Sequence, residues 1–339
     1  MEKITMDHGS GGKLSHKLIK EVVVKAFSNP SLNKLDDSAI LNLSNLGGCT
    51  GRIAFTTDSY VVNPIFFPGG DIGMLAVNGT VNDLSMMGAI PLYLSASCIV
   101  EEGFPMPDFK KIIQSMKKAS QQAGVYIVTG DLKVVEKGAA DKMFVNTSGI
   151  GIVPKGVNLS AHNARRSDVI ILSGSIADHG IAIINERNNL KLKGNLKTDS
   201  QPLNFLVKKM LGVSKNIHCL RDPTRGGLAT TLNEIAESSG KGIEIDENRV
   251  PIKKKVSSSC EMLGFDPLYV ANEGKLIAIV AEKDAKKVIL AMKSTKQGRN
   301  AAIIGKVVQD KENKVILKTS IGGRRILDMM TGEQLPRIC

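Results

Sequence analysis

The sequence predicts an α/β (α+β) protein of two domains, because short apolar runs alternate with amphipathic stretches in each half of the chain. Its 339 residues exceed one ordinary core and suit two domains of about 150 residues each. A hydrophobic content of 42% and a charged content of 23% are typical of a globular protein. We predict a first domain over residues 1–155, a second over 156–320 and a mobile C-terminal tail over 321–339.

In the first half, short apolar runs predict strands and amphipathic stretches predict helices. The predicted strands are 53–57, 92–99, 126–128 and 143–153, and the predicted helices are 72–87 and 108–123. Pro107 marks the entry of the second helix. We expect the strand at 126–128 to stop at Thr129-Gly130-Asp131.

The same rhythm begins again after a turn-rich boundary near Pro154-Lys155-Gly156. The second half predicts strands at 168–172, 275–280 and 302–308, with helices at 176–189, 227–239 and 283–292. The first of these helices carries a polar break at Asp178-His179-Gly180. From about residue 321 the chain has glycines and a proline but no core period, so we expect a semi-flexible tail there.

The charge and the hydropathy of the sequence limit which classes of partner and which cellular location we expect. The net charge is +12, and residues 156–339 carry 30 Lys and Arg against 19 acids. The lysines are dispersed and only 4% of residues are aromatic, so we expect no nucleic acid and interpret the excess as a solvated face; an acidic protein partner stays open. No run of about 18 apolar residues occurs and the start lacks a signal peptide's apolar stretch, which predicts a cytoplasmic protein without a membrane partner.

The chain ends on a cysteine, Cys339. The other four, Cys49, Cys98, Cys219 and Cys260, are scattered without a Cys-x-x-Cys pair and are best interpreted as small buried hydrophobes. Nine residues from Thr331 to Cys339 would let the thiol sweep about 30 Å, far enough to enter an active site in its own or a partner subunit. The alternative is that a terminal residue is frayed and inert, as most are.

The first half of the sequence contains candidates for a phosphate-binding loop and for a Mg²⁺ site. Asp7 to Lys13 is a glycine-rich run at a predicted helix start, where free backbone N–H groups could cradle phosphate, although a flexible loop is an equal alternative. Asp36, Asp37, Asp58, Asp83 and Asp131 follow predicted strands or turns, and acids gathered at one sheet rim suit Mg²⁺ that bridges to nucleotide phosphates. Each acid taken alone is more simply a cap or turn former.

Further polar groups lie near these acids in the sequence. Asn78 to Asp83 is a polar cluster on a helix that is otherwise small and apolar, and such a cluster needs partners. Lys133 follows Asp131 by two residues, which puts both on one face of a strand. Residues 146–149 add hydrogen-bonding groups on the next predicted strand, and Glu273 lies at the start of a later one.

Seven motifs, in this order along the chain, carry a resemblance to a known protein family. They are His8-Gly-Ser-Gly-Gly12, Phe55-Thr-Thr-Asp-Ser-Tyr60, Asn82-Asp83, Gly130-Asp131-Leu-Lys133, Asp222-Pro-Thr-Arg-Gly-Gly227, Ala271-Asn-Glu-Gly-Lys275 and Pro336-Arg-Ile-Cys339. Together they resemble the HypE family of hydrogenase maturation factors, in the superfamily of aminoimidazole ribonucleotide synthetase, selenophosphate synthetase and thiamine-monophosphate kinase. The resemblance covers essentially the whole chain, and the Pro-Arg-Ile-Cys end narrows it to HypE.

The resemblance implies a two-domain aminoimidazole ribonucleotide synthetase-like fold and an ATP-dependent dehydratase. A carbamoyltransferase, HypF, would load a carbamoyl group onto the terminal sulfur. ATP with Mg²⁺ would activate the amide oxygen, and loss of phosphate would leave a thiocyanate. The cyano group would pass to a HypC-HypD complex that carries iron, as the cyanide ligand of [NiFe]-hydrogenase. HypE relatives are homodimers with each nucleotide site at or near the subunit interface.

The resemblance also implies roles for single residues. Cys339 would carry the substrate group, Glu273 would act as the base, and Lys133 would neutralise phosphate charge or shuttle a proton. Asp37, Asp58, Asp83 and Asp131 would hold Mg²⁺ and, with Asn82, Asn146 and the loop Gly9, Ser10, Gly11 and Gly12, would contact the nucleotide.

Two rival interpretations remain. The first is another ATP-dependent synthetase or kinase of the same superfamily, in which Cys339 is incidental. The second is a non-catalytic binding module that uses its tail as a docking peptide. The first predicts ATP turnover without Cys339, and the second predicts neither turnover nor a covalent adduct on the tail.

Overall fold

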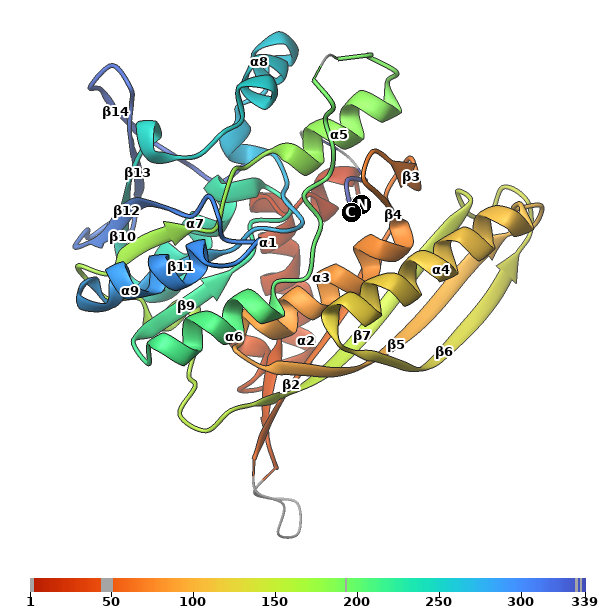
Figure 1. Cartoon of the computed structure of the whole chain (residues 1–339), viewed down its shortest axis with the longest axis horizontal. Coiled ribbons are helices and arrows are strands. Elements are labelled where there is room, and N and C mark those ends of the chain that lie inside the picture. The colour runs from red at the N-terminus through yellow and green to blue at the C-terminus, as the bar shows by residue number, and fades with distance from the viewer. Residues whose placement is uncertain (1–2, 44–50, 193, 333–334, 336) are drawn as a thin grey trace.

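The computed structural model describes residues 3–43, 51–192, 194–332, 335 and 337–339. Two sheets form the core of the molecule, one from each half of the chain, with helices packed between and around them (Figure 1). This confirms the predicted α/β class. The predicted domain boundaries near residues 155 and 320 stay predictions.

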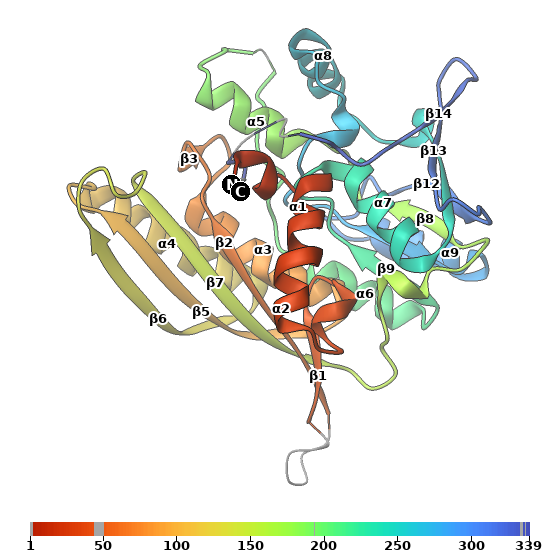
Figure 2. The same ribbon diagram turned by 180° about the vertical axis from the view of Figure 1, so that it is seen from behind.

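The N-terminal half forms a five-stranded sheet in the order β1-β2-β7-β5-β6, in which only the β5–β6 pair is parallel. Its strands are β1 (Ala39–Asn42), β2 (Arg52–Tyr60), β5 (Ile90–Glu101), β6 (Tyr126–Val135) and β7 (Met143–Val153). Helices α3 (Ile72–Met86) and α4 (Met106–Ala123) pack on one face, beside a two-stranded ribbon of β3 (Phe66–Phe67) and β4 (Gly70–Asp71). No helix of the described residues covers the other face of the sheet (Figure 2).

Helix α3 is buried almost all round because it lies between the sheet and the second half of the chain. Asp71 caps it, since its carboxylate accepts hydrogen bonds from the N–H groups of Gly73 (2.9 Å) and Met74 (3.0 Å). A Cβ at Gly73 would lie 2.7 Å from the carbonyl oxygen of Ile112, so glycine lets α4 pack closely against α3.

The C-terminal half forms a seven-stranded mixed sheet in the order β14-β13-β10-β12-β8-β11-β9. Its strands are β8 (Val169–Leu172), β9 (Ile217–Arg221), β10 (Gly242–Asp246), β11 (Ile277–Val280), β12 (Ala302–Val308), β13 (Val315–Lys318) and β14 (Arg324–Ile326). Its helices are α5 (Asp178–Arg187), α6 (Asn204–Val213), α7 (Gly227–Ser239), α8 (Lys254–Leu263) and α9 (Glu282–Lys293). The strand β11 is buried on both faces, as its unbroken apolar sequence requires.

Most predicted elements are present, and three have the predicted bounds: β7, α7 and β12. The predicted stop at Thr129-Gly130-Asp131 is wrong, because β6 runs on to Val135 beside β5. A Cβ at Gly130 would lie 2.3 Å from the carbonyl oxygen of Ala96. The glycine therefore admits the neighbouring strand and does not form a turn.

The prediction of a semi-flexible tail from about residue 321 is also wrong in part. Arg324–Ile326 form β14, which pairs with β13, and Leu327 is buried in the core of this sheet. Ile338 is buried as well, although it lies in the core of the N-terminal half. The sequence lacks a core period here because, of the tail residues that the structure describes, only these isolated apolar ones are buried.

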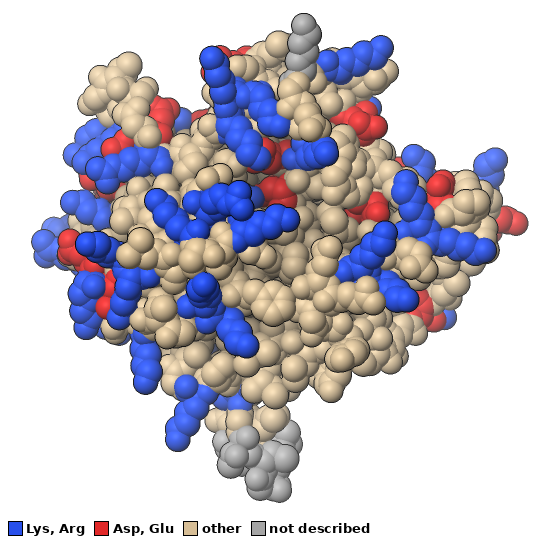
Figure 3. Space-filling view, viewed as in Figure 1, with Lys and Arg blue, Asp and Glu red and all other residues tan. Residues whose placement is uncertain are grey.

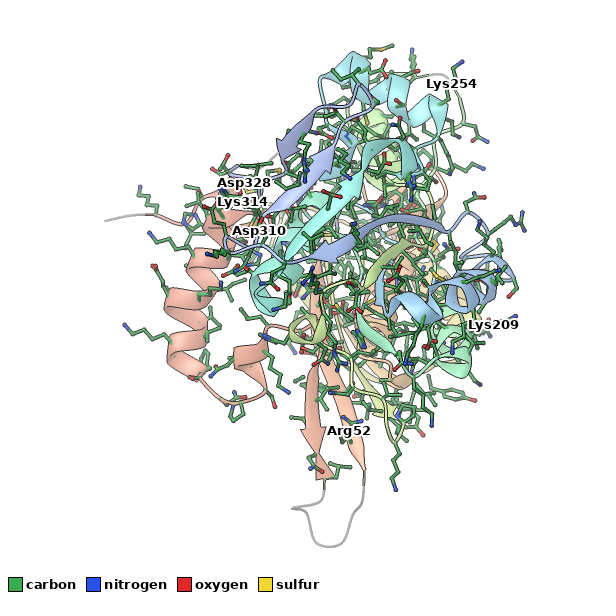
Figure 4. All side chains as sticks on the ribbon, turned by 90° about the vertical axis from the view of Figure 1, so that its left-hand side faces the viewer. Arg52, Lys209, Lys254, Asp310, Lys314 and Asp328 are labelled. Atoms are coloured by element: carbon green, nitrogen blue, oxygen red, sulfur yellow. The ribbon has the colours of Figure 1, made fainter. Side chains whose placement is uncertain are left out.

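The first helical segment of the chain packs against the C-terminal half, where His16 contacts Glu234 (2.8 Å). It comprises α1 (Lys13–Leu18), a wider π-helical stretch (Ile19–Val24) and α2 (Lys25–Phe27). Lys13 forms an ion pair of 2.6 Å with Asp328, which Figure 4 shows beside this helix. The two ends of the chain lie close together in both ribbon views (Figures 1 and 2).

Basic side chains are spread over both halves of the face in Figure 3 and do not gather in one stripe. Among the described residues, no helix combines the length and the apolar character needed to cross a membrane.

Candidate functional site

The end of the chain is docked beside the strand β2. The N–H of Val61 donates to an oxygen of the C-terminal carboxylate of Cys339 (2.9 Å), and the N–H of Asn63 donates to the carbonyl of Arg337 (3.2 Å). The two bonds pair the chain end antiparallel to residues 61–63. Ile338 lies between them and inserts its side chain into the core.

A cavity of about 300 Å³ lies at this docked end. Its lining includes Gly9, Ser10, Arg225, Ile338 and Cys339. Burial raises the pKa of the Cys339 thiol to about 12, although the Arg225 guanidinium opposes the rise. The docked sulfur is therefore a neutral thiol at neutral pH and a poor nucleophile.

Acids from both halves of the chain meet next to the thiol. Burial raises the pKa values of Asp37, Asp58, Asp83 and Glu273. The neighbouring carboxylate of Asp222 adds to the rise for Asp83 and Glu273, and burial raises the pKa of Asp222 itself to about 6. Such a group of acids favours cationic or proton-sharing ligands.

These acids come from different kinds of element. Asp58 lies inside β2 on the face toward α3, Asp83 lies in α3, and Asp37 precedes β1. Asp222 follows β9, and Glu273 precedes β11. The expectation that the acids gather at strand ends is thus wrong for Asp58 and Asp131, which lie within strands. Tertiary packing, and not one sheet rim, gathers the cluster.

Two basic residues, Arg221 and Lys275, form ion pairs that hold the acids in place. Arg221 contacts Asp37 (2.9 Å) and Glu234 (2.5 Å) from a buried position. Lys275 pairs with Asp199 (2.8 Å), whose carboxylate also accepts from the backbone N–H of Glu273 (3.1 Å). This second pair fixes the backbone at Glu273, and one oxygen of the Glu273 carboxyl has no hydrogen-bond partner among the described atoms.

Whether Mg²⁺ fits this cluster depends on how the carboxylates are arranged and on which of their oxygens lack a partner. Within the described ranges, no group of three or more His, Cys, Asp and Glu side chains is arranged to hold a metal ion unaided. One oxygen each of Asp37 and Glu273 is buried without a hydrogen-bond partner among described atoms. The cluster therefore fits an ion that takes one or two carboxylates and completes its shell with phosphate oxygens, as Mg²⁺ on a nucleotide does.

Asp131, Lys133 and Asn146 do not join this cluster within one chain. They lie on the face of the N-terminal sheet that carries no helix, where Asp131 and Lys133 form an exposed ion pair of 3.0 Å. Ser59, Asn146, Ser97 and Asp131 are neighbours in successive strands and form a polar row across this face. Asp58, next to Ser59, points to the opposite side.

The predicted nucleotide contacts of the glycine-rich loop and of Asn82 stay predictions, although several of their polar groups have partners within the chain. The glycine-rich loop was expected to offer free amides, but the N–H groups of Ser10, Gly12 and Lys13 donate to Asp7, Ser10 and Met330 respectively. A Cβ at Gly12 would lie 2.4 Å from the carbonyl oxygen of Met330, so this glycine serves close packing. Gly9 and Ser10 still line the cavity, and Arg225 donates to the carbonyl of Gly9 (2.6 Å).

The side-chain amide of Asn82 has partners within the chain in this arrangement. Its amide N–H₂ donates to the carbonyls of Gln201 (3.2 Å) and Glu273 (3.4 Å), and its oxygen accepts from the N–H of Leu203 (2.8 Å). Asn82 therefore joins α3 to the C-terminal half beside Glu273.

Arg225, Asp222, Asp199 and Lys275 belong to the site but were not predicted as site residues. Three of them stand inside the quoted motifs Asp222–Gly227 and Ala271–Lys275, so the motifs contained the signal. Asp199 stands outside every motif, and only its contacts with Lys275 and Glu273 reveal it.

Comparison with known proteins places the chain among related folds. Residues 35–153 match the family of AIR synthase related proteins, N-terminal domain, and residues 165–318 match the corresponding C-terminal domain. The carbamoyl dehydratase HypE of Azotobacter vinelandii is 50% identical over 336 residues, which are 99% of this chain and 97% of that protein.

Two solved structures are also similar. The structure of a HypE-HypF complex aligns with a TM-score of 0.87 at 47% identity, over 92% of this chain and 99% of that one. The structure of HypE in complex with ATP aligns with a TM-score of 0.83 at 48% identity, over 99% of this chain and 100% of that one.

Proposed function

The chain belongs to the HypE family of carbamoyl dehydratases, and from this premise we propose that it converts an S-carbamoyl group on Cys339 to a thiocyanate with ATP. The product supplies the cyanide ligand for the iron of [NiFe]-hydrogenase. The observation that carries the proposal is the docked chain end, which brings the Cys339 thiol beside Glu273, Asp58 and Arg225. Intact mass is the test: the tail should gain one carbamoyl group from a carbamoyl donor system and then lose one water with ATP.

The chemistry needs a better leaving group and a base. A carboxamide keeps its oxygen at neutral pH because hydroxide leaves poorly. Transfer of the γ-phosphoryl group of ATP to the carbamoyl oxygen releases ADP and makes that oxygen part of a phosphate ester. Departure of phosphate breaks the C–O bond while the nitrogen loses its two protons, which leaves S–C≡N.

Glu273 is our candidate for the base that removes a proton from nitrogen. Its side chain is buried, one of its oxygens has no partner among the described atoms, and it lies near the Cys339 sulfur. Burial raises its pKa above the ordinary range, which strengthens it as a base. Arg225, whose charge acts on Cys339, Asp58 and Glu273, is placed to balance negative charge as the phosphate departs.

Asp37, Asp58 and Asp83 would hold the Mg²⁺ that accompanies ATP, which neutralises phosphate charge when bound. The replacement Asp83→Asn should weaken binding of Mg-ATP by at least about tenfold, measured by calorimetric titration. The exposed Glu136→Gln is the matched control and should bind normally. Unchanged affinity in the Asp83 variant would remove this residue from the binding site.

The same variant should stabilise the nucleotide-free protein at neutral pH. A carboxyl with a raised folded-state pKa binds more protons folded than unfolded, so its contribution to stability is present at low pH and is lost as pH rises. Asparagine removes this loss, and we expect the melting temperature at pH 7 to rise by roughly 2–4 °C. The difference should vanish below about pH 4, where Asp83 is protonated in both states.

HypF is the proposed carbamoyl donor, since a relative forms a complex with it. Because the docked thiol has a pKa of about 12, it should accept the carbamoyl group only after the tail leaves its docked position. The HypC-HypD complex is the proposed acceptor of the cyano group. The cytoplasmic location expected from the sequence stays a prediction.

A homodimer is the proposed assembly, formed through the helix-free face of the N-terminal sheet. Phe55, Tyr93, Ile99, Ile150 and Ile152 on this face each leave 39–50% of their surface exposed. An apolar face of this kind normally lies against a partner. A second copy on it would also cover the polar row, so Asp131, Lys133 and Asn146 would join a site between subunits.

The replacement Ile150→Glu tests the assembly by placing a charge on the centre of this face. It should shift the protein from dimer to monomer and raise the dimer dissociation constant at least about a hundredfold, as light scattering after gel filtration would measure. Ile321→Glu is the control, because Ile321 is 93% exposed on a loop of the other half. A monomeric wild-type protein, or a dimeric Ile150 variant, would contradict the assembly.

A further inference from the structure

We propose that His179 and Arg187 are positioning residues that dock the chain end by its backbone, so that docking does not depend on what the Cys339 sulfur carries. The inference rests on the proposed function. It adds an account of how one tail can bring a thiol, a carbamoyl group and a thiocyanate to the same site in turn.

His179 lies in the first turn of α5, within the polar break noted in the sequence. Its Nε2 lies 2.8 Å from the carbonyl oxygen of Ile338, and its Nδ1 lies 2.7 Å from the hydroxyl of Thr198. A carbonyl can only accept, so Nε2 carries the proton and Nδ1 accepts from Thr198. The ring also packs edge-on against Phe67, with 5.7 Å between centroids.

This arrangement keeps His179 neutral and fixed in one tautomer. Burial lowers its pKa, although the nearby Asp199 carboxylate opposes the shift. The Nε2–H of His179 thus donates to the Ile338 carbonyl in the docked state. It holds the peptide group immediately before Cys339.

Arg187, at the other end of α5, holds the preceding peptide group. Its Nη2 donates to the carbonyl of Arg337 (2.7 Å), and its Nε donates to the carbonyl of Asn63 (2.6 Å). One guanidinium therefore joins the chain end to the segment that follows β2. Arg337 adds its own contacts, since its Nε donates to the carbonyl of Val61 (2.9 Å) and its guanidinium pairs with Asp141.

These contacts share one property. Each uses a main-chain atom of Arg337, Ile338 or Cys339, or the Arg337 side chain, and the sulfur takes part in none of them. The Ile338 side chain fills the core in addition. A thiol, a carbamoyl group and a thiocyanate on Cys339 should therefore dock in the same register, with the sulfur in the same place, so that the carbon of the carbamoyl group is presented to Glu273.

Hydrogen exchange of the Val61 and Asn63 amides reports docking directly, because both donate to the chain end. In His179→Ala their exchange should be about tenfold faster, the effect of one buried hydrogen bond. His179→Gln keeps an N–H donor and should restore most of the protection. His162→Ala, an exposed histidine that contacts Ser238, is the matched control and should match wild type.

The second comparison changes the sulfur. Carboxamidomethylation of Cys339 with iodoacetamide, verified by peptide mass, places an amide near the position of a carbamoyl group. Exchange at Val61 and Asn63 should then stay within about twofold of the unmodified protein. A strong loss of protection on modification would overturn cargo-independent docking, and unchanged exchange in His179→Ala would remove His179 from it.

The third measurement separates positioning from folding and from the proposed function. His179→Ala should accept a carbamoyl group normally but dehydrate it about tenfold more slowly in a single turnover, with rescue by glutamine. Normal dehydration by His179→Ala would overturn the positioning role. The exchange measurements need neither ATP nor a carbamoyl donor, so they test docking even if wild type never forms a thiocyanate.

Discussion

Cys339→Ala abolishes the covalent adduct: intact mass after incubation with HypF, a carbamoyl donor and ATP should show an unmodified chain at every time point. The reason is chemical, because no other described cysteine lines the cavity beside Glu273 and Arg225. Wild type should show first the carbamoyl adduct and then its loss of one water. Formation of thiocyanate should fall to zero in the variant.

Cys260→Ala is the control for this result, since Cys260 is buried in α8 away from the cavity. It should form both adducts at wild-type rates. If Cys339→Ala instead turned over ATP as fast as wild type with an external acceptor, the protein would be a small-molecule kinase or synthetase with an incidental tail. If wild type showed neither ATP turnover nor an adduct, the binding-module interpretation would replace ours.

Glu273→Gln should stop the reaction after the carbamoyl group is loaded, at the dehydration step. The variant should accept the carbamoyl group, because loading takes place away from the docked position, but dehydrate it about 10²–10⁴-fold more slowly. Glutamine matches the size and hydrogen bonding of the neutral acid but cannot take a proton from nitrogen. The carbamoyl adduct should therefore accumulate, as intact mass would record.

The pH profile gives an independent check on Glu273. Burial and the neighbouring Asp222 and Asp199 carboxylates raise its pKa, so the basic form appears only as pH climbs through that raised value. Single-turnover dehydration in wild type should rise with pH over this range, and the rise should be absent in Glu273→Gln. Glu261→Gln, on the exposed side of α8, should keep the wild-type profile. Normal thiocyanate formation by Glu273→Gln would exclude it as the base.

The sequence predicted elements best where periodicity is strong and local. The bounds of α7 follow from apolar residues at helical spacing and from Gly240 at its end. Those of β7 follow from a strand-like stretch with interior glycines, whose alternating burial only the structure shows. Gly130 misled the prediction because a glycine that ends a strand and a glycine that admits a neighbouring strand look alike in one dimension. The space beside it is defined by Ala96, more than thirty residues away.

The candidate site divides in the same way. The acids Asp58 and Asp83, the base Glu273 and the carrier Cys339 could be named from motifs, because a motif records residue type and order, and Asp37 from its place after a predicted strand or turn. The sequence did not reveal Asp199, which contacts Glu273 from outside every motif, or the different placements of neighbours on β2. Asp58 faces inward and Ser59 outward, so the predicted partners Asn146 and Asp131 lie across the sheet from the acids.

The sequence by itself determined the α/β class, the two-part organisation of the sheets and the chemical groups available, because these depend on composition, local period and residue identity. Only the tertiary structure decided which groups meet. Packing of α3 between the two halves brings Asp83, Asp222 and Glu273 together, and docking of residues 337–339 beside β2 brings the Cys339 thiol to them. Desolvation and contact depend on atoms that are distant in the chain, so raised pKa values and a backbone-held terminus arise only when both halves fold around the same end.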